Sequence, residues 1–133
     1  GVCPTMIDPQ LTKNFHIKEW RCRDGTGVPW NLVENVIKCA TNLQALRDEV
    51  GKAVTLISGY RNKTYNTKID GSRNSQHMLG LAADIRVNGI RPVELASLIE
   101  TLIKDGRMMQ GGLGTYSSFV HYDCRGTRAR WNG

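Results

Sequence analysis

Apolar residues recur at helical spacing in two stretches of the chain. In residues 31–50 they fall at steps of three and four and give one apolar face: Val33, Val36, Ile37, Ala40, Leu43, Leu46 and Val50. Asn31 and Glu34 have the spacing of a capping box, and Gly51 follows as a C-terminal cap, so we expect a helix over 31–50. Residues 92–104 repeat the pattern behind an initial proline and predict a second helix.

Short β-branched and apolar runs predict four strands. They are residues 53–57, 81–87, 111–116 and 119–124, with Ser117-Ser118 joining the last two as a hairpin. We expect the first of these strands to be buried, and residues 62–74, which are polar, to form an exposed loop. Residues 1–30 are rich in turn formers and predict an irregular segment packed on the core. Together the pattern predicts a single domain over residues 1–133, of the α+β class, with helices packed on a small antiparallel sheet.

Composition narrows the range of partners. The chain has 133 residues, 40% hydrophobic and 23% charged, which is typical of one globular domain. Since no apolar run approaches the ~20 residues that span a bilayer, we expect no membrane span. The net charge of +6 favours a polyanionic partner, such as the anionic polymers of a bacterial wall. Its basic residues are not interleaved with aromatic ones, so we expect no nucleic-acid partner.

The four cysteines leave two alternatives open. Cys3, Cys22, Cys39 and Cys124 contain no CxxC pair, which argues against a structural zinc site built on thiolates. Their even number fits disulfides in an oxidising compartment, while four buried free thiols are equally compatible with the sequence. Four cysteines allow three disulfide connectivities, and the sequence does not choose among them.

Two histidines and one aspartate stand in short segments rich in small residues. Because seven extended residues would span ~23 Å, the chain must fold back between His77 and Asp84 to bring them together, and Gly80 permits such a bend. Asp84 lies in an apolar run and needs a strong partner, either a divalent cation or an arginine. His121 lies in a second apolar strand. Taken alone, each residue fits a hydrogen-bonded core position, but the combination favours a catalytic zinc with one position open to water.

These residues carry a resemblance to a known family. The motif Ser75-x-His77-x-x-Gly80-x-Ala82-x-Asp84 resembles the signature of the zinc D-alanyl-D-alanine carboxypeptidase family, which shares its fold with lysostaphin-type peptidases and the hedgehog signalling domain. Residues 58–61, 111–114 and 119–123 resemble the flanking segments of that family, and residues 128–131 look like its phage and bacterial wall-lytic branch. The resemblance covers about residues 15–131.

The resemblance implies a function and a set of site residues. His77, Asp84 and His121 would be the Zn²⁺ ligands. Arg61 would bind the substrate carboxylate and stabilise the oxyanion, with a surface salt bridge as the alternative. Ser75 would line the substrate site, with a cap or turn as the alternative. The implied activity is hydrolysis of peptidoglycan stem peptides next to D-amino acids, by a carboxypeptidase or an endolysin-like endopeptidase. We expect such a protein to be a monomer that acts outside the cytoplasm or is carried by a phage.

One departure from the family pattern concerns the general base. Members commonly carry an acidic residue three positions before the last zinc histidine, and this chain has Ser118 there. Asp123 follows His121 by two residues, so on a regular strand it points to the same face. We expect Asp123 to serve as the acid/base, with orientation of a ligand as the other role open to it. Without a base, the chain would be a non-catalytic zinc module for wall binding or phage tail assembly.

Overall fold

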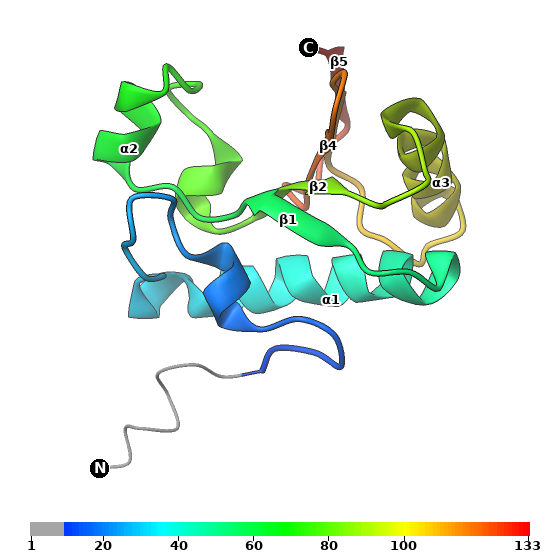
Figure 1. The fold of residues 1–133 in the computed structure, drawn as a ribbon, viewed down its shortest axis with the longest axis horizontal. Coiled ribbons are helices and arrows are strands. Elements are labelled where there is room, and N and C mark those ends of the chain that lie inside the picture. Colours follow the sequence, from blue (N-terminus) through cyan, green and yellow to red (C-terminus); the bar gives the residue numbers. More distant parts are fainter. Residues whose placement is uncertain (1–9) are drawn as a thin grey trace.

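The computed structural model describes residues 10–133 (Figure 1). Over this range the chain forms, in order, η2 (Ile17–Trp20), η3 (Trp30–Leu32), α1 (Val33–Val50), β1 (Thr55–Ser58), α2 (Lys63–Lys68), η4 (Gln76–Leu79), β2 (Ala82–Arg86), α3 (Pro92–Lys104), β3 (Gly112–Thr115), β4 (Val120–Asp123) and β5 (Ala129–Asn132), where η marks a 3₁₀ helix. Within these residues the strands form one sheet in the order β1-β2-β4-β3-β5. The α+β class is confirmed.

Both expected helices are present. α3 has the predicted bounds, with Pro92 in its first turn and a buried face formed by Leu95, Ala96, Ile99 and Leu102. α1 ends as predicted at Gly51, whose φ of +66° is the left-handed conformation that glycine adopts readily. The expected capping box is wrong, because the turn η3 takes up Asn31 and leaves Leu32 at the N-cap without a side-chain bond. Among the described residues, no helix combines the length and the apolar character that crossing a bilayer requires.

The sheet differs from the prediction at its two edges. β1 is not buried as expected, since it lies at the edge of the sheet and its residues are exposed or half-buried. At the other edge, β5, which the sequence pattern does not predict, pairs with β3 in parallel, while the pairs β1–β2, β2–β4 and β3–β4 are antiparallel. The segment expected as a polar loop contains α2, which begins at Asn62 because its side chain accepts a hydrogen bond of 2.7 Å from the backbone N–H of Tyr65.

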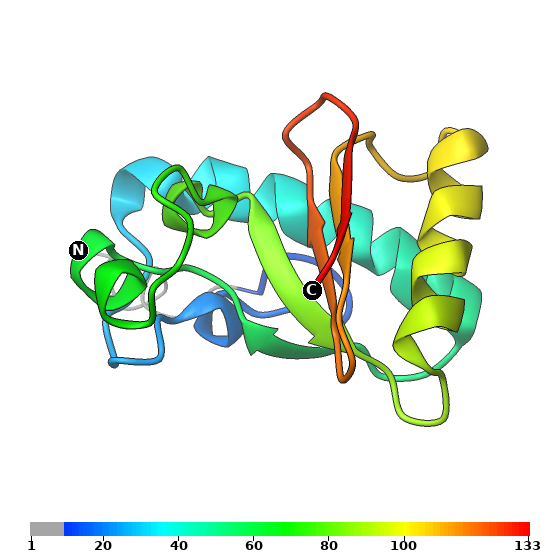
Figure 2. The ribbon, with the colours of Figure 1, turned by 90° about the horizontal axis from the view of Figure 1, so that it is seen from above.

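The hydrophobic core lies between the sheet and the two long helices. α1 packs against β2, and α3 contacts β3, β4 and α1 (Figure 1). Figure 2 shows β3, β4 and β5 standing between α3 on one side and the segment of α2 and η4 on the other. Fully buried side chains from all of these layers form the core: Val36, Leu43, Leu46, Ile85, Leu95, Ile99, Leu102 and Val120. The polar site described below opens on the side of α2 and η4.

The irregular N-terminal segment packs on this core where it is described. Phe15 and Trp20 are fully buried and meet edge to face, with ring centroids 5.9 Å apart. The backbone C=O of Trp20 accepts a 2.8 Å hydrogen bond from the N–H of Tyr60, just after β1. The segment is thereby attached to the sheet next to its edge strand β1. Residues 1–9 of the expected N-terminal segment lie outside the described residues.

Candidate metal centre

His77 is fixed by the turn that precedes β2. The Oγ atom of Ser75 accepts a hydrogen bond from the backbone N–H of His77 and starts η4, which ends at Gly80 with a φ of +75°. A Cβ atom at position 80 would lie 3.0 Å from Cγ2 of Val36, which is a tight contact, so both the backbone angle and the packing favour glycine. The chain therefore folds back between His77 and Asp84, as the spacing predicts.

The pairing of β2 with β4 brings Asp84 and His121 together. They are 37 positions apart in the sequence but lie directly opposite each other in the antiparallel register. Opposed residues on neighbouring strands point to the same face of a sheet. The same register places Asp123 two residues further along β4 on the same face. The pairing of the two strands thus brings together two of the three candidate ligands.

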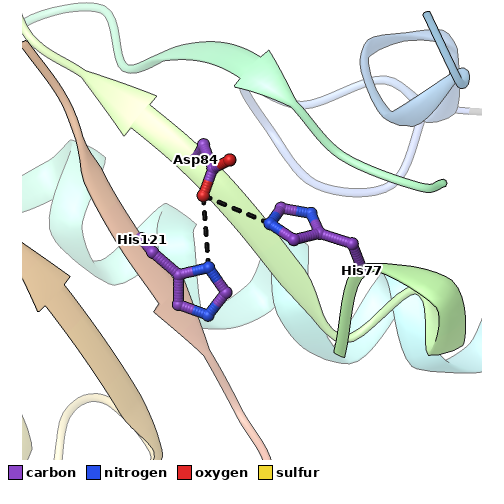
Figure 3. A group of neighbouring side chains, drawn as sticks. All are labelled: His77, Asp84 and His121. Atoms are coloured by element: carbon purple, nitrogen blue, oxygen red, sulfur yellow. Dashed lines mark hydrogen bonds and ion pairs between the residues drawn. The ribbon is translucent and has the colours of Figure 1, made fainter. Parts of the chain in front are cut away.

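The three side chains converge on one point (Figure 3). Oδ1 of Asp84 is 3.2 Å from Nε2 of His77 and 3.2 Å from Nδ1 of His121. One ligand atom of each residue lies within 4.8 Å of the others, and all three residues are buried. Ligand atoms about 2.0–2.2 Å from a tetrahedral zinc are ~3.3 Å apart, which is close to the distances seen here. The donor set of two imidazole nitrogens and one carboxylate oxygen is that of catalytic zinc sites.

The hydrogen bonds on the far side of each ring fix the tautomers. Nδ1 of His77 lies 2.6 Å from the C=O of Gly59, and Nε2 of His121 lies 2.7 Å from Oδ2 of Asp123. Because both partners are acceptors, these ring nitrogens must carry the proton. In the neutral rings the two nitrogens that face Asp84 are then unprotonated. Three acceptors directed at one another require a positive charge between them, so the residues present fit a bound cation.

The pKa values of the three groups shift in different directions. Burial lowers the pKa of His77 and exceeds the opposing effect of Asp84. Burial also acts to lower the pKa of His121, but bonds to Asp123 and Asp84 outweigh it, and the net pKa is raised. For Asp84, burial acts to raise the pKa, and the bonds to His121 and His77 hold it well below its usual range. Asp84 is therefore ionised, as a metal ligand must be.

Arg61 completes the floor of the site. Its Nη2 donates to Oδ2 of Asp84 at 3.0 Å, and its Nε lies 3.3 Å from Oγ of Ser58. The pair leaves Oδ1 of Asp84 directed at the two histidines. The side chain of Arg61 is 15% exposed and lines the adjoining cleft, where its other N–H groups can reach a bound molecule. Of the two partners expected for Asp84, the arginine is therefore present, and Oδ1 faces the two histidines of the candidate cation site.

Asp123 is enclosed by donors. Its Oδ2 contacts His121 and Nη2 of Arg125, and its Oδ1 accepts from the N–H of Gly112 at 2.9 Å and from Nε of Arg125 at 2.9 Å. The residue is fully buried. Burial acts to raise its pKa, but Arg125, His121 and Gly112 outweigh burial and hold the pKa of Asp123 well below its usual range. Of the two roles open to Asp123, these contacts support orientation of His121.

A cleft of about 690 Å³ leads from the surface to the three candidate ligands. Ser75 caps η4, as one of its two alternatives states, and it also lines this cleft. Asp70, which is exposed, lies on the wall of the cleft. Other residues of the lining are Gly71, Ser72, Asn74, Gln76, Tyr116, Phe119, Arg125 and Trp131. Ser118 lies in the exposed turn between β3 and β4.

Aromatic residues and Arg125 form a part of the site that the sequence pattern does not predict. The ring of Trp131 is 5.0 Å from the ring of His121, and its Nε1 donates to the Tyr116 hydroxyl at 2.9 Å. Arg125 lies over the Trp131 ring at 5.7 Å while it binds Asp123. Gly114 makes this possible, because a Cβ atom there would collide with the indole of Trp131. The run of glycines before the hairpin was the available signal, since it marks close approach of another group.

Comparisons with known proteins agree with this geometry and confirm the family resemblance. The sequence profile of the peptidase M15 family matches residues 10–123. A curated relative, the zinc D-Ala-D-Ala carboxypeptidase of Streptomyces albus G, is 40% identical over 52 residues. That alignment covers 38% of this chain and 20% of the relative. Because the profile extends over most of the chain, the chain belongs to the peptidase M15 family.

Proposed function

We propose that this protein is a zinc-dependent peptidase that hydrolyses peptide bonds next to D-amino acids in bacterial peptidoglycan. The observation that carries the proposal is the convergence of His77, Asp84 and His121 at the floor of an open cleft, with Arg61 beside them. Membership of a peptidase family and the name of the relative from Streptomyces albus G support it.

The proposed chemistry assigns separate roles to the residues of the site. His77, Asp84 and His121 would hold Zn²⁺, which supplies a Lewis acid that polarises the scissile carbonyl and lowers the pKa of water. Arg61 binds Oδ2 of Asp84 and leaves Oδ1 facing the histidines, and its remaining N–H groups stabilise the negative charge that develops on the carbonyl oxygen. Asp123 holds the ring of His121 in the tautomer that offers Nδ1 to the metal.

The substrate class rests on the cleft and on the relative. A cleft of about 690 Å³ accommodates a short peptide, and its lining combines Arg61 with polar side chains such as Ser75 and Asn74. The guanidinium suits a peptide carboxylate. Peptidoglycan stem peptides carry carboxylates and D-amino acids, so both a terminal D-Ala-D-Ala bond and a crosslink are candidate substrates.

The charge of the surface supports a location on the bacterial wall, outside the cytoplasm or delivered there by a phage. The chain carries a net charge of +6, and Arg21, Arg23 and Arg47 line a second cavity of about 640 Å³. Its described lining residues differ from those of the metal cleft. Anionic wall polymers would be attracted to this face and would raise the local concentration of substrate around the cleft.

Hydrolysis of defined wall peptides tests the proposed function. Purified protein with zinc is incubated with a stem peptide that ends in D-Ala-D-Ala and with crosslinked wall fragments, and products are identified by mass spectrometry. We expect release of D-alanine or cleavage of the crosslink. Arg61→Ala is expected to lower kcat/KM by about 10²–10³-fold, because a donor to the oxyanion is lost. Arg107→Ala, at an exposed ion pair with Glu49, is the matched control and should retain activity.

A second candidate function follows from Ser118. Since an exposed serine stands where family members commonly carry an acidic residue, the chain could bind zinc without hydrolysis and serve as a wall-binding or phage tail assembly module. The same experiment separates the two. Wild-type protein with stoichiometric zinc and no product from either substrate would contradict the peptidase proposal and favour the module.

A further inference from the structure

A second arginine, Arg125, lines the cleft that leads to the candidate ligands. It follows the end of β4 by two residues. Its side chain is 30% exposed, against 15% for that of Arg61, so it lies closer to solvent than the arginine at the floor of the site. The contact of Arg125 with Asp123 explains how the side chain is held but occupies only part of its guanidinium.

The guanidinium of Arg125 is held from several directions. Its Nε donates to Oδ1 of Asp123 at 2.9 Å and its Nη2 to Oδ2 at 2.8 Å, so one edge of the group forms a bidentate pair. Its central carbon lies over the ring of Trp131, 5.7 Å from the centroid. Gly112 leaves room for it, because a Cβ atom there would lie 2.8 Å from Nη2. A side chain held in this way loses little conformational freedom when it binds a further group.

The other edge of the guanidinium has donors to spare. A guanidinium carries more N–H groups than one carboxylate can accept. Among the described residues, Nη1 of Arg125 has no hydrogen-bond partner, and both oxygens of Asp123 are already bonded. The edge formed by Nη1 and Nη2 is therefore a second planar fork on a residue that lines the cleft. Such a fork matches the two oxygens of a carboxylate.

Arg125 lies close to a candidate ligand without contacting it. Its Nη2 and Nε2 of His121 share one oxygen, Oδ2 of Asp123, at 2.8 and 2.7 Å. The guanidinium is thus a single carboxylate away from the ring of His121. Since one residue of extended peptide spans ~3.3 Å, a peptide cut at the centre can place a group one or two residues from the cut bond on Arg125. Arg61 instead binds Asp84 directly and lies beside the position of the scissile carbonyl.

An aromatic wall adjoins Arg125. Nε1 of Trp131 donates to the hydroxyl of Tyr116 at 2.9 Å, and the ring of Tyr116 stacks on that of Phe119 with centroids 4.4 Å apart. All three rings line the cleft. Apolar surroundings lower the local dielectric and strengthen the attraction between a guanidinium and an anion. Asp70, an exposed carboxylate of the lining, belongs to the segment between α2 and η4 and not to this wall.

We propose that Arg125 binds a carboxylate of the substrate peptide, one or two residues from the bond that is cut, while Arg61 stabilises the oxyanion. The assignment rests on the proposed function, because the ligand is the substrate of that reaction. The carboxylate is either the free C-terminus of the peptide or an acidic side chain next to the cut bond, and both present the same pair of oxygens. A C-terminal carboxylate would make the protein a carboxypeptidase, and a side-chain carboxylate is compatible with cleavage of a crosslink.

Paired peptides test the proposal by NMR titration of zinc-free protein, since zinc would itself bind a carboxylate. One pair is N-acetyl-D-Ala-D-Ala and its carboxamide. The other is the carboxamide of N-acetyl-D-Ala-D-Glu and that of N-acetyl-D-Ala-D-Gln. We expect the wild type to bind the charged member of at least one pair about 10-fold more tightly, and that pair identifies the source of the carboxylate. In Arg125→Ala and Arg125→Gln the two members should bind equally.

The ratio within a pair distinguishes recognition from a structural role. If Arg125 only supported Asp123, its loss would weaken both members alike and leave their ratio unchanged. Arg61→Ala, and Arg128→Ala at an exposed arginine nearby in the sequence, should keep the wild-type ratio.

A preference that survives in both Arg125 variants, or that Arg61→Ala removes, would overturn the proposal. A wild type without any preference would overturn it as well. These affinities do not depend on hydrolysis, so a failure of the proposed peptidase activity is distinguishable from a failure of this assignment.

Discussion

His121 has a different partner on each ring nitrogen, and together they determine its role. Asp123 accepts from Nε2 at 2.7 Å, and Nδ1 lies 3.2 Å from Asp84. A carboxylate that binds the far nitrogen of a ligating histidine fixes its tautomer and raises its basicity. Asp123 is fully buried with both oxygens bonded, and His121 and Arg125 lie between it and the cleft, so a substrate there does not contact it directly.

Replacing Asp123 separates the two roles considered for it. We expect Asp123→Asn to weaken zinc binding about 10–100-fold, because an amide can also donate and no longer enforces the tautomer of His121. Once zinc is saturating, the rate of peptide hydrolysis should recover most of its wild-type value. Zinc titration and kcat at saturating zinc give the two readouts.

Asp70→Asn is the matched variant, since Asp70 is an exposed carboxylate on the wall of the same cleft. It should leave zinc affinity unchanged. A large fall of kcat in Asp123→Asn, with unchanged zinc affinity, would identify Asp123 as the acid/base and contradict the orienting role.

At the scale of elements, the turn between η4 and β2 sets the distance between two candidate ligands. Gly80 adopts a φ of +75° and packs against Val36 of α1. Gly106, after α3, has nearly the same φ of +76°, but a Cβ atom at that position would meet no other atom within 4 Å. The two glycines therefore share their backbone requirement and differ in packing.

Alanine substitutions at these two glycines measure what the packing of the turn contributes. Gly106→Ala should lower the free energy of unfolding by about 1–2 kcal/mol, through backbone strain alone. Gly80→Ala should cost more and should also weaken zinc binding, because relief of the contact with Val36 displaces η4 and His77 with it. Urea unfolding and zinc titration check both effects. Equal losses of stability with unchanged zinc affinity would show that the turn does not position the site.

The elements that the sequence predicts well are those with a strong local signal. α3 has a proline at its start and a continuous apolar face, and β2 and β4 are short apolar runs. α2 escapes prediction because its six residues carry mostly polar side chains, and its cap at Asn62 has no apolar pattern beside it. β5 is not predicted because its residues are mostly half-buried and have no clear apolar pattern. It is stabilised by contacts with residues distant in the sequence, such as that of Arg130 with Glu100.

The part of the candidate site that has a strong local sequence signal could also be predicted. His77, Asp84 and His121 stand in a motif whose spacing implies a bend, and the structure brings them together. Two further contacts determine the environment of Asp123. The backbone N–H of Gly112, on the neighbouring strand β3, donates to its carboxylate, and so does the side chain of Arg125. No periodicity of the sequence encodes that three-way contact. The sequence alone therefore leaves the acid/base and orienting roles of Asp123 open, and only its environment in the fold distinguishes them.

At the scale of the whole molecule, the fold separates a rigid apolar half from a polar half that carries the cleft. α1 and α3 lie against the sheet on one side, and α2 and η4 lie on the other (Figures 1 and 2). Residues 69–77, which connect α2 to η4, form a wall of the cleft. Candidate ligands from β2 and β4 are supported by the packed core, and His77 is supported by the C=O of Gly59. Such a scaffold holds its ligands before any metal binds, which favours tight binding.

Zinc content after equilibrium dialysis is the decisive measurement, because the proposed chemistry depends on a single cation held by three side chains. We expect one zinc per chain for the wild type, a rise in Tm on zinc addition, and loss of both in His77→Ala and His121→Ala. His16→Ala, at a histidine of the N-terminal segment, should bind zinc as the wild type does. Wild-type protein without zinc, or stoichiometric zinc retained by His77→Ala and His121→Ala, would contradict the proposed zinc site.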